Sequence, residues 1–126
     1  MASLDHLILN VNDVAATVAF YTSILGFQED GKAGPFTVLR VNATTTLQLA
    51  QRKTDGGEHL AFALSKSEFD QVFARIRERG LDYGPSFLAV GTQTGPGDEI
   101  GAEGMGKAIY FFDPSKHLLE IRHYDR

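Results

Sequence analysis

The chain has 126 residues, of which 43% are hydrophobic and 22% are charged, and its formal net charge at pH 7 is −4. A net negative charge without any cluster of Lys and Arg argues against a nucleic-acid partner, and the absence of cysteine excludes disulfides and thiolate metal sites. No apolar run approaches the ~20 residues of a membrane helix, and the N-terminal residues do not resemble a signal peptide, so we expect a cytoplasmic protein with no membrane partner.

The first half of the chain predicts a strand, a helix and two further strands. Residues 4–11 form a short apolar run with β-branched side chains, which is typical of a strand. Apolar residues at helical spacing then predict a helix over residues 13–25, which Gly26 would end as a C-terminal cap. Two strands are expected next, at residues 36–41 and 45–50.

The second half of the chain repeats this order. Residues 58–64 predict a strand, and Ser65 with Glu68 three residues later has the capping-box spacing that starts a helix, which Gly80 would end. Three further strands are expected, at residues 85–90, 108–112 and 117–123. Residues 91–106 are rich in glycine, and we expect them to form a long mobile loop of the kind that serves as a lid or binding segment.

The two halves therefore form an internal repeat of about fifty residues. We predict one α+β domain over residues 1–126, made of two modules at about 1–54 and 55–126, whose curved sheets close into a cup. Superposing one module on the other places His6 over His59. The same superposition places Gln48 over Glu120, so that each module offers one polar residue in its first strand and another in its last.

Glu120 is the residue that fits its surroundings least well. It stands between Leu119 and Ile121 in a strand otherwise suited to a core, and burying a carboxylate costs several kcal/mol unless a cation or strong donors meet it. If the cup brings His6 and His59 to Glu120, two imidazoles and a carboxylate with open positions would suit a divalent metal. Iron(II) or manganese(II) fits best, and zinc(II) or nickel(II) would also bind such a site.

The chain also resembles the vicinal oxygen chelate superfamily, which includes glyoxalase I, extradiol dioxygenases, fosfomycin resistance proteins and bleomycin resistance proteins. The resemblance rests on three segments: Asp5-His6-Leu7, Leu25-Gly26-Phe27, and the stretch from Tyr110 through Asp113-Pro114 to Leu119-Glu120-Ile121. It implies two βαβββ modules and a homodimer in which sites are shared, so that His6 of one subunit joins His59 and Glu120 of the other as metal ligands.

The resemblance also implies a function. Members chelate vicinal oxygens of a small organic substrate at the metal, so we expect a metal-dependent enzyme, a lyase or an extradiol-type dioxygenase, with Glu120 and Tyr110 as catalytic residues. The alternative is a metal-free protein of the bleomycin-resistance type that sequesters a small molecule. A tyrosine ten residues before the glutamate, as Tyr110 is here, also occurs in the dioxygenases and the fosfomycin-modifying enzymes.

The remaining candidates have two interpretations each. Tyr110 either donates a hydrogen bond to a substrate oxygen or is a core aromatic residue. Arg122 either pairs with a substrate carboxylate or is a surface residue or a partner of Glu120. Gln48 is either a ligand or, as we favour, a polar wall residue that contacts substrate. We expect His117 and His123 to face solvent or an interface.

Overall fold

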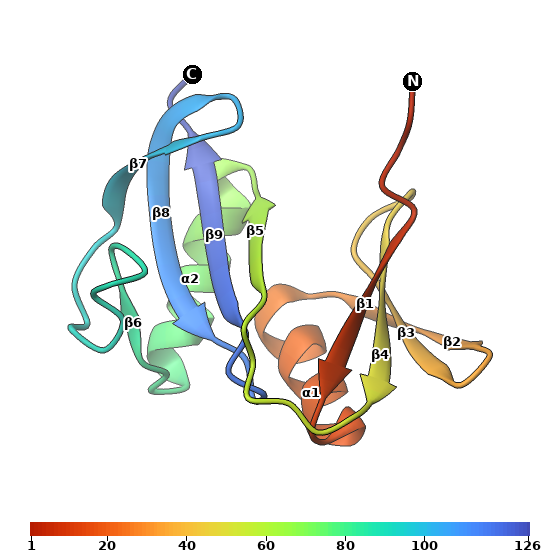
Figure 1. Ribbon diagram of the computed structural model, residues 1–126. Helices are drawn as coiled ribbons and strands as arrows, with labels where there is room; N and C mark the ends of the chain where they lie inside the picture. Colours follow the sequence, from red (N-terminus) through yellow and green to blue (C-terminus); the bar gives the residue numbers. More distant parts are fainter. The chain divides into compact units, whose positions relative to one another are not determined.

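Each half of the chain builds its own sheet and its own helix. The computed structural model describes residues 1–126, and these divide into two units, Met1–Gly56 and Gly57–Arg126 (Figure 1). The division falls two residues beyond the boundary between the predicted modules. Neither unit contains a helix with the length and hydropathy of a membrane span.

The first unit is a four-stranded sheet in the order β1-β4-β3-β2, with β1 parallel to β4 and the other pairs antiparallel. Its elements are β1 (His6–Val11), α1 (Val14–Phe20), η1 (Tyr21–Leu25), β2 (Gln28–Ala33), β3 (Phe36–Arg40) and β4 (Thr46–Gln51).

Local sequence signals set the limits of the helical segment. The Asp13 side chain accepts a hydrogen bond from the Ala16 N–H at 2.9 Å, as an N-cap does. Gly26 ends the segment with φ of 76°, a left-handed conformation that glycine adopts without strain. The predicted single helix is in fact an α-helix followed by a turn of π-helix, η1.

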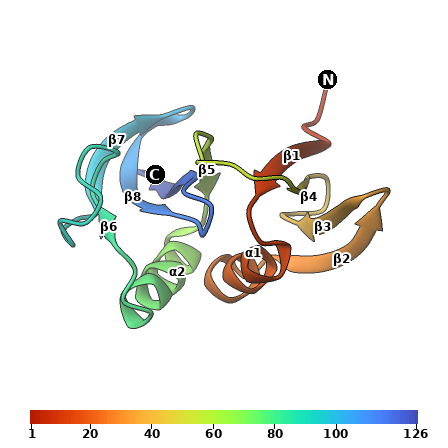
Figure 2. The same cartoon turned by 60° about the horizontal axis from the view of Figure 1, so that its bottom comes forward.

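The helix covers one face of this sheet and leaves the other open (Figure 2). Because side chains alternate along a strand, the covered face takes the buried residues Leu9, Leu47 and Leu49. The opposite face takes His6 and Gln48. Two of the predicted site residues are therefore on the open face of the first unit.

The second unit repeats this plan with a sheet in the order β5-β9-β8-β6, and β7 pairs with β8 off this path. Here β5 is parallel to β9, and the remaining pairs are antiparallel. Its elements are β5 (His59–Ala63), α2 (Lys66–Glu78), β6 (Tyr83–Gly84), β7 (Gly97–Gly101), β8 (Gly104–Phe112) and β9 (Leu118–Tyr124).

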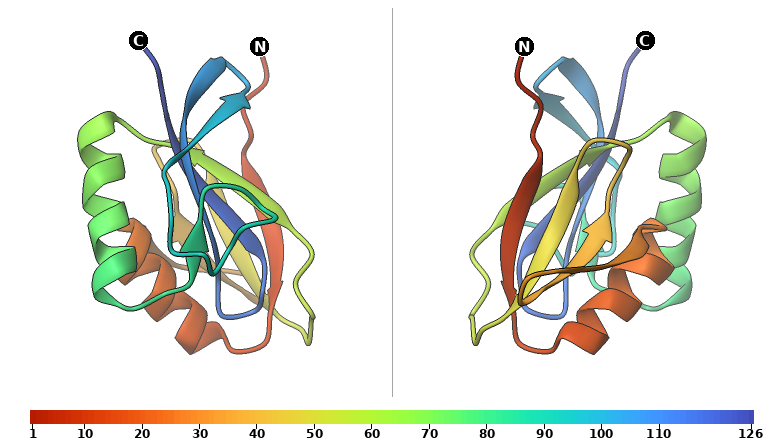
Figure 3. Two further views of the ribbon diagram at one scale, coloured as in Figure 1. Left: turned by 90° about the vertical axis from the view of Figure 1, so that its left-hand side faces the viewer. Right: turned by 90° about the vertical axis from the view of Figure 1, so that its right-hand side faces the viewer.

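Helix α2 packs on one face of this second sheet (Figures 2 and 3). The predicted capping box is present: the Ser65 hydroxyl accepts from the Glu68 N–H, and the Glu68 carboxylate accepts from the Ser65 N–H, both at 3.1 Å. These hydrogen bonds lower the pKa of Glu68. The buried stripe of α2 packs toward β9, where the ring centroids of Phe69 and His123 are 4.8 Å apart.

The strand registers confirm the repeat. In the first unit Gln48 is paired with Ile8, two residues after His6. In the second unit Glu120 is paired with Ala61, two residues after His59. The strand registers therefore superpose His6 on His59 and Gln48 on Glu120, as the sequence predicts. The two modules also have the same strand–helix–strand topology.

Three predictions about individual elements are wrong. Strand β2 was not expected, because its residues are polar and nearly all exposed. Residues 85–90 form turns instead of a strand: the chain folds back so closely on Gly84 that a Cβ there would lie 1.9 Å from the Ala89 carbonyl oxygen. Residues 91–106 are not one loop, because β7 and the start of β8 pair within them as a hairpin.

The expected exposure of His117 is also wrong. Its side chain is buried, and its Nδ1 accepts a hydrogen bond from the Glu58 N–H at 3.2 Å. The backbone N–H of His117 donates to the Asp113 carboxylate at 3.0 Å. His117 therefore joins the turn before β9 to the start of β5.

Candidate functional site

Glu120 lies in the middle of β9, on the sheet face opposite α2. The neighbouring side chains of β9, Leu119 and Ile121, are fully buried on the helix-covered side. Across the ladders Glu120 is paired with Tyr110 on β8 and with Ala61 on β5. Paired residues of adjacent strands project to the same face, so these side chains surround the carboxylate.

His59 and Arg122 contact the two oxygens of the Glu120 carboxylate. His59 Nε2 is 3.0 Å from Oε1, and Arg122 Nη1 donates to Oε2 at 2.9 Å. The side chains of Glu120 and Arg122 are only 6% and 4% exposed, whereas that of His59 is 48% exposed. The carboxylate–guanidinium pair of Glu120 and Arg122 is therefore buried, and His59 is the member of the cluster that solvent can reach.

Tyr110 adds a hydroxyl group to this cluster. Its pKa is raised, first by burial and then by the side-chain hydrogen bond with Glu120 and the charge of that carboxylate. The phenol is protonated at neutral pH, as an ordinary tyrosine is, and donates its hydrogen bond to Glu120; the shift keeps it protonated further into the alkaline range. Its ring lies beside the imidazole of His59, with centroids 5.8 Å apart.

Arg122 is the cation that meets the buried charge of Glu120. Its other terminal nitrogen, Nη2, donates to the Glu99 carbonyl at 2.9 Å, and its guanidinium stacks 4.6 Å from the Tyr124 ring centroid. A metal is therefore not required to neutralise Glu120. Because these contacts occupy both terminal nitrogens, the role of Arg122 in binding a substrate carboxylate stays a prediction.

His6 and Gln48 lie in the first unit. His6 Nδ1 is 2.8 Å from the Asp5 carboxylate, and the imidazole is 42% exposed. Gln48 lines an open cavity of about 590 Å³ on the face opposite α1, together with Asp5, Arg40 and Thr46. This placement suits a polar wall residue, and contact of Gln48 with substrate stays a prediction.

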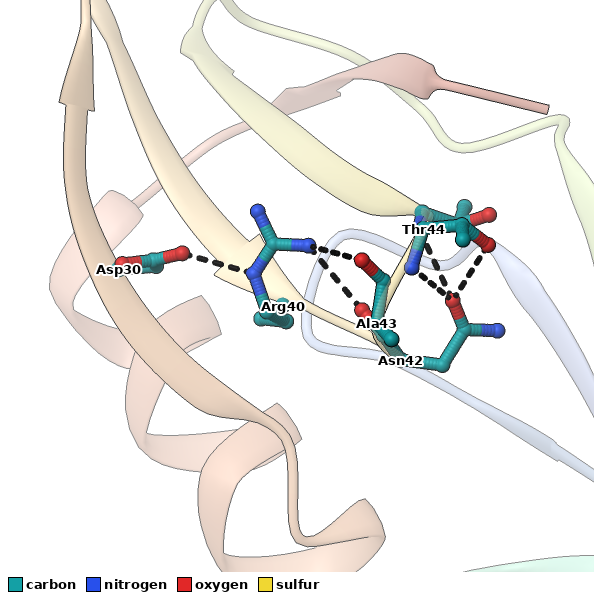
Figure 4. A network of polar contacts seen from close by, with 6 residues as sticks. Asp30, Arg40, Asn42, Ala43 and Thr44 are labelled. Carbon is teal, nitrogen blue, oxygen red and sulfur yellow. Dashed lines mark hydrogen bonds and ion pairs between the residues drawn. The ribbon is translucent and has the colours of Figure 1, made fainter. Parts of the chain in front are cut away.

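Arg40 was not singled out from the sequence, although it shares the open face with Val38 by simple alternation. Its Nε donates to Asp30 at 2.8 Å and its Nη1 to the Asn42 carbonyl at 3.1 Å (Figure 4). Asn42 in turn accepts hydrogen bonds from the N–H groups of Thr44 and Thr45, which closes the turn between β3 and β4. The network fixes a cation at the rim of the cavity.

The donor atoms in the second unit fit two adjacent ligands of one metal ion. Ligand atoms at 2.0–2.2 Å from an ion and at right angles to each other lie about 3.0 Å apart, and His59 Nε2 and Glu120 Oε1 have a separation of 3.0 Å. Neither unit alone gathers three His, Cys, Asp or Glu side chains around one position. The second unit therefore offers two donor atoms at a spacing that ligands of one ion have, and the roles of His59, Glu120 and His6 as metal ligands stay predictions.

The chain is similar to known proteins over nearly its whole length. The model of the Glyoxalase/Bleomycin resistance protein/Dioxygenase superfamily matches residues 3–121. Metallothiol transferase FosB of Shouchella clausii is 28% identical over 94% of this chain and 77% of its own length. Virulence protein STM3117 of Salmonella typhimurium is 29% identical over 96% of this chain and 83% of its own length. Among solved structures, oxidase ChaP-H1 is 31% identical, covers 99% of this chain and 98% of its own, and has a TM-score of 0.81.

Proposed function

This chain belongs to the glyoxalase/bleomycin resistance protein/dioxygenase superfamily, and on that premise we propose that it is a metal-dependent enzyme acting on a small organic substrate with two adjacent oxygens. The observation that carries the proposal is the pair of donor atoms, His59 Nε2 and Glu120 Oε1, 3.0 Å apart on the open face of the sheet. Similarity to a metallothiol transferase and to an oxidase supports an enzyme that uses a metal.

The proposed ligands are His59 and Glu120 of one subunit and His6 of a second copy of the chain. His6 suits this role because its Nδ1 is paired with Asp5 at 2.8 Å, which leaves Nε2 available. Metal-binding histidines usually donate their other ring N–H to a carboxylate in this way, which fixes the tautomer. Two histidines and one carboxylate favour iron(II) or manganese(II), with zinc(II) or nickel(II) as further candidates.

The chemistry divides between the ion and the side chains. A bound divalent ion would supply Lewis-acid stabilisation of negative charge on the substrate oxygens. Tyr110 is protonated and hydrogen-bonded to Glu120 in the free site, and on substrate binding its single O–H would turn from that carboxylate to a substrate oxygen. Gln48 would contact substrate from the wall of its cavity. We propose a lyase or an extradiol-type dioxygenase reaction at this site.

A second candidate function is metal-free binding of a small molecule. One observation favours it: Arg122 already compensates the buried charge of Glu120 at 2.9 Å, so the unit is electrostatically complete without an ion. In that case the open face of the second unit would bind the ligand through His59 and Tyr110.

Elemental analysis of protein purified without chelators or metal-affinity resin separates the two candidates. The metalloenzyme predicts about one divalent ion per chain in the wild type and its loss in Glu120→Ala and His59→Ala. Iron or manganese would direct assays to catechols and dioxygen uptake, and nickel or zinc to adducts of glyoxals. No ion in the wild type, even after incubation with iron(II), manganese(II), nickel(II) and zinc(II), would contradict the enzyme and favour the binding protein.

A further inference from the structure

Arg122 joins Glu120 to the hairpin formed by β7 and β8. Its side chain is 4% exposed, and its two terminal nitrogens reach in different directions: Nη1 to the Glu120 carboxylate and Nη2 to the backbone carbonyl of Glu99 on β7, both at 2.9 Å. The residues paired with Arg122 on the two neighbouring strands are Ala63 and Ala108. These small side chains leave room on the sheet for the guanidinium to lie against it.

Gly101 at the end of β7 completes the enclosure of Arg122. A Cβ at Gly101 would lie 2.4 Å from Cζ of Arg122 and 2.7 Å from both Nε and Nη1. Real contacts of this kind do not occur, so any larger residue would displace the guanidinium. The Nε group is buried and has no hydrogen-bond partner, a cost that the other contacts of Arg122 must offset.

We propose that Arg122 is a positioning residue which, held by the β7–β8 hairpin, fixes Glu120 so that Oε1 alone is presented beside His59. This inference rests on the proposed metal site and deepens it. A carboxylate can bind an ion through one oxygen or two, and Arg122 occupies Oε2, which restricts Glu120 to one. The hairpin therefore controls the geometry of the site through a single arginine.

A residue that hydrogen-bonds to a metal ligand, as Arg122 does to Glu120, matters for metal binding because it orients the ligand before the ion binds. Loss of a residue that supports a metal ligand commonly costs about 10- to 100-fold in metal affinity. A substitution at Gly101, which touches neither Glu120 nor His59, should therefore weaken metal binding by displacing Arg122. A purely structural hairpin would show no such effect.

The test compares two alanine substitutions in the same strand by cobalt(II) titration, followed by absorbance. Gly101→Ala drives its Cβ into Arg122, whereas Gly97→Ala drives its Cβ to 2.4 Å from the Pro85 carbonyl oxygen at the other end of β7. We expect cobalt(II) affinity to fall about 10- to 100-fold in Gly101→Ala, with an altered spectrum, and to change less than about threefold in Gly97→Ala. Equal affinities in the two variants, or tighter binding by Gly101→Ala, would overturn the positioning role.

Hydrogen exchange provides a readout that needs no metal and does not depend on Gly101 variants folding. Arg122→Lys should speed exchange of the β7 amides, because lysine cannot contact Glu120 and the Glu99 carbonyl at once. Arg126→Ala is the matched control, since it removes the exposed Glu103 ion pair of the same hairpin and should leave β7 unchanged. Unchanged β7 exchange in Arg122→Lys would contradict the anchoring of the hairpin.

The two experiments also separate failure of the inference from failure of the proposed function. A wild type that binds no cobalt(II) contradicts the metal site, and the positioning role with it. A wild type that binds cobalt(II), together with Gly101→Ala and Gly97→Ala variants of equal affinity, contradicts the positioning role alone.

Discussion

Replacing Arg122 with methionine would leave the Glu120 carboxylate buried without its cation. Methionine preserves most of the apolar volume of the side chain, so the change chiefly removes the guanidinium. Both partners are nearly inaccessible, at 4% and 6% exposed. Breaking a buried ion pair by removing one partner costs about 3–5 kcal/mol, because the other charge stays buried and uncompensated.

The lower end of that range applies here, because His59 and Tyr110 still donate hydrogen bonds to Glu120. We therefore expect Arg122→Met to lower the free energy of unfolding by about 3 kcal/mol. For a chain of this size that corresponds to a fall in Tm of about 12 °C. Urea denaturation followed by circular dichroism measures the first quantity, and a thermal melt measures the second.

A double-mutant cycle isolates the ion pair from other effects of the substitution. If the cost arises from the unpaired charge, Glu120→Gln in the Arg122→Met background should recover about 2 kcal/mol of it. Arg126→Ala, which breaks an exposed pair with Glu103, should cost no more than about 1 kcal/mol. A loss below about 1 kcal/mol in Arg122→Met, or strictly additive effects in the cycle, would refute this account of the buried pair.

Three further substitutions test other parts of the structure. Ser65→Ala should cost about 1 kcal/mol by denaturation, because the Glu68 N–H loses its acceptor. The Ser65 side chain also lowers the pKa of Glu68, so the part of the cost that comes from this carboxylate should be present above pH 4.5 and be lost as pH falls through the lowered pKa, while the remainder persists. Gly84→Ala should cost more than about 2 kcal/mol, since its Cβ would meet backbone at 1.9 Å; a wild-type melt would contradict the close approach. The raised pKa of Tyr110 keeps its phenol protonated just above pH 10. Tyr110→Phe should therefore leave the absorbance titration of the folded protein unchanged in that pH range. If the variant instead lacks a phenolate absorbance step that the wild type shows there, the hydroxyl does not face Glu120.

The repeat is the part of the fold that sequence predicted best. Hydrophobic periodicity and helix-capping signals recur in both halves, and each signal is local, so the strand–helix–strands order could be read without knowing any tertiary contact. Aligning His6 with His59 then gave the registers that the structure shows at Gln48 and Glu120.

The elements that sequence missed lack an apolar pattern. Strand β2 is an exposed edge strand, and pairing with β3 forms it without burying side chains. The β7–β8 hairpin is glycine-rich because three of its glycines lie where a Cβ would collide with neighbouring atoms: Gly97, Gly101 and Gly106. Close packing is therefore the reason for those glycines. An argument from composition alone interprets the same glycines as a sign of flexibility.

The contacts of Glu120 could be predicted in part from the sequence. The contact between His59 and Glu120 follows from strand alternation and the parallel pairing of β5 with β9. Arg122 lies two residues after Glu120, and alternation placed both on one face, but its burial depends on the hairpin and could not be deduced from spacing. The burial of His117 likewise depends on Glu58, which is distant in sequence.

The central claim, a metal site shared between two copies of the chain, is tested most directly by mixing two defective variants. His6→Ala and Glu120→Ala should each bind no metal as homodimers. In a mixed dimer one site combines His6 of one chain with Glu120 of the other and is intact, whereas the second site carries both defects. An equal mixture after subunit exchange should therefore recover about a quarter of the wild-type metal content. Recovery of none, with the wild type fully loaded, would contradict a site shared between subunits.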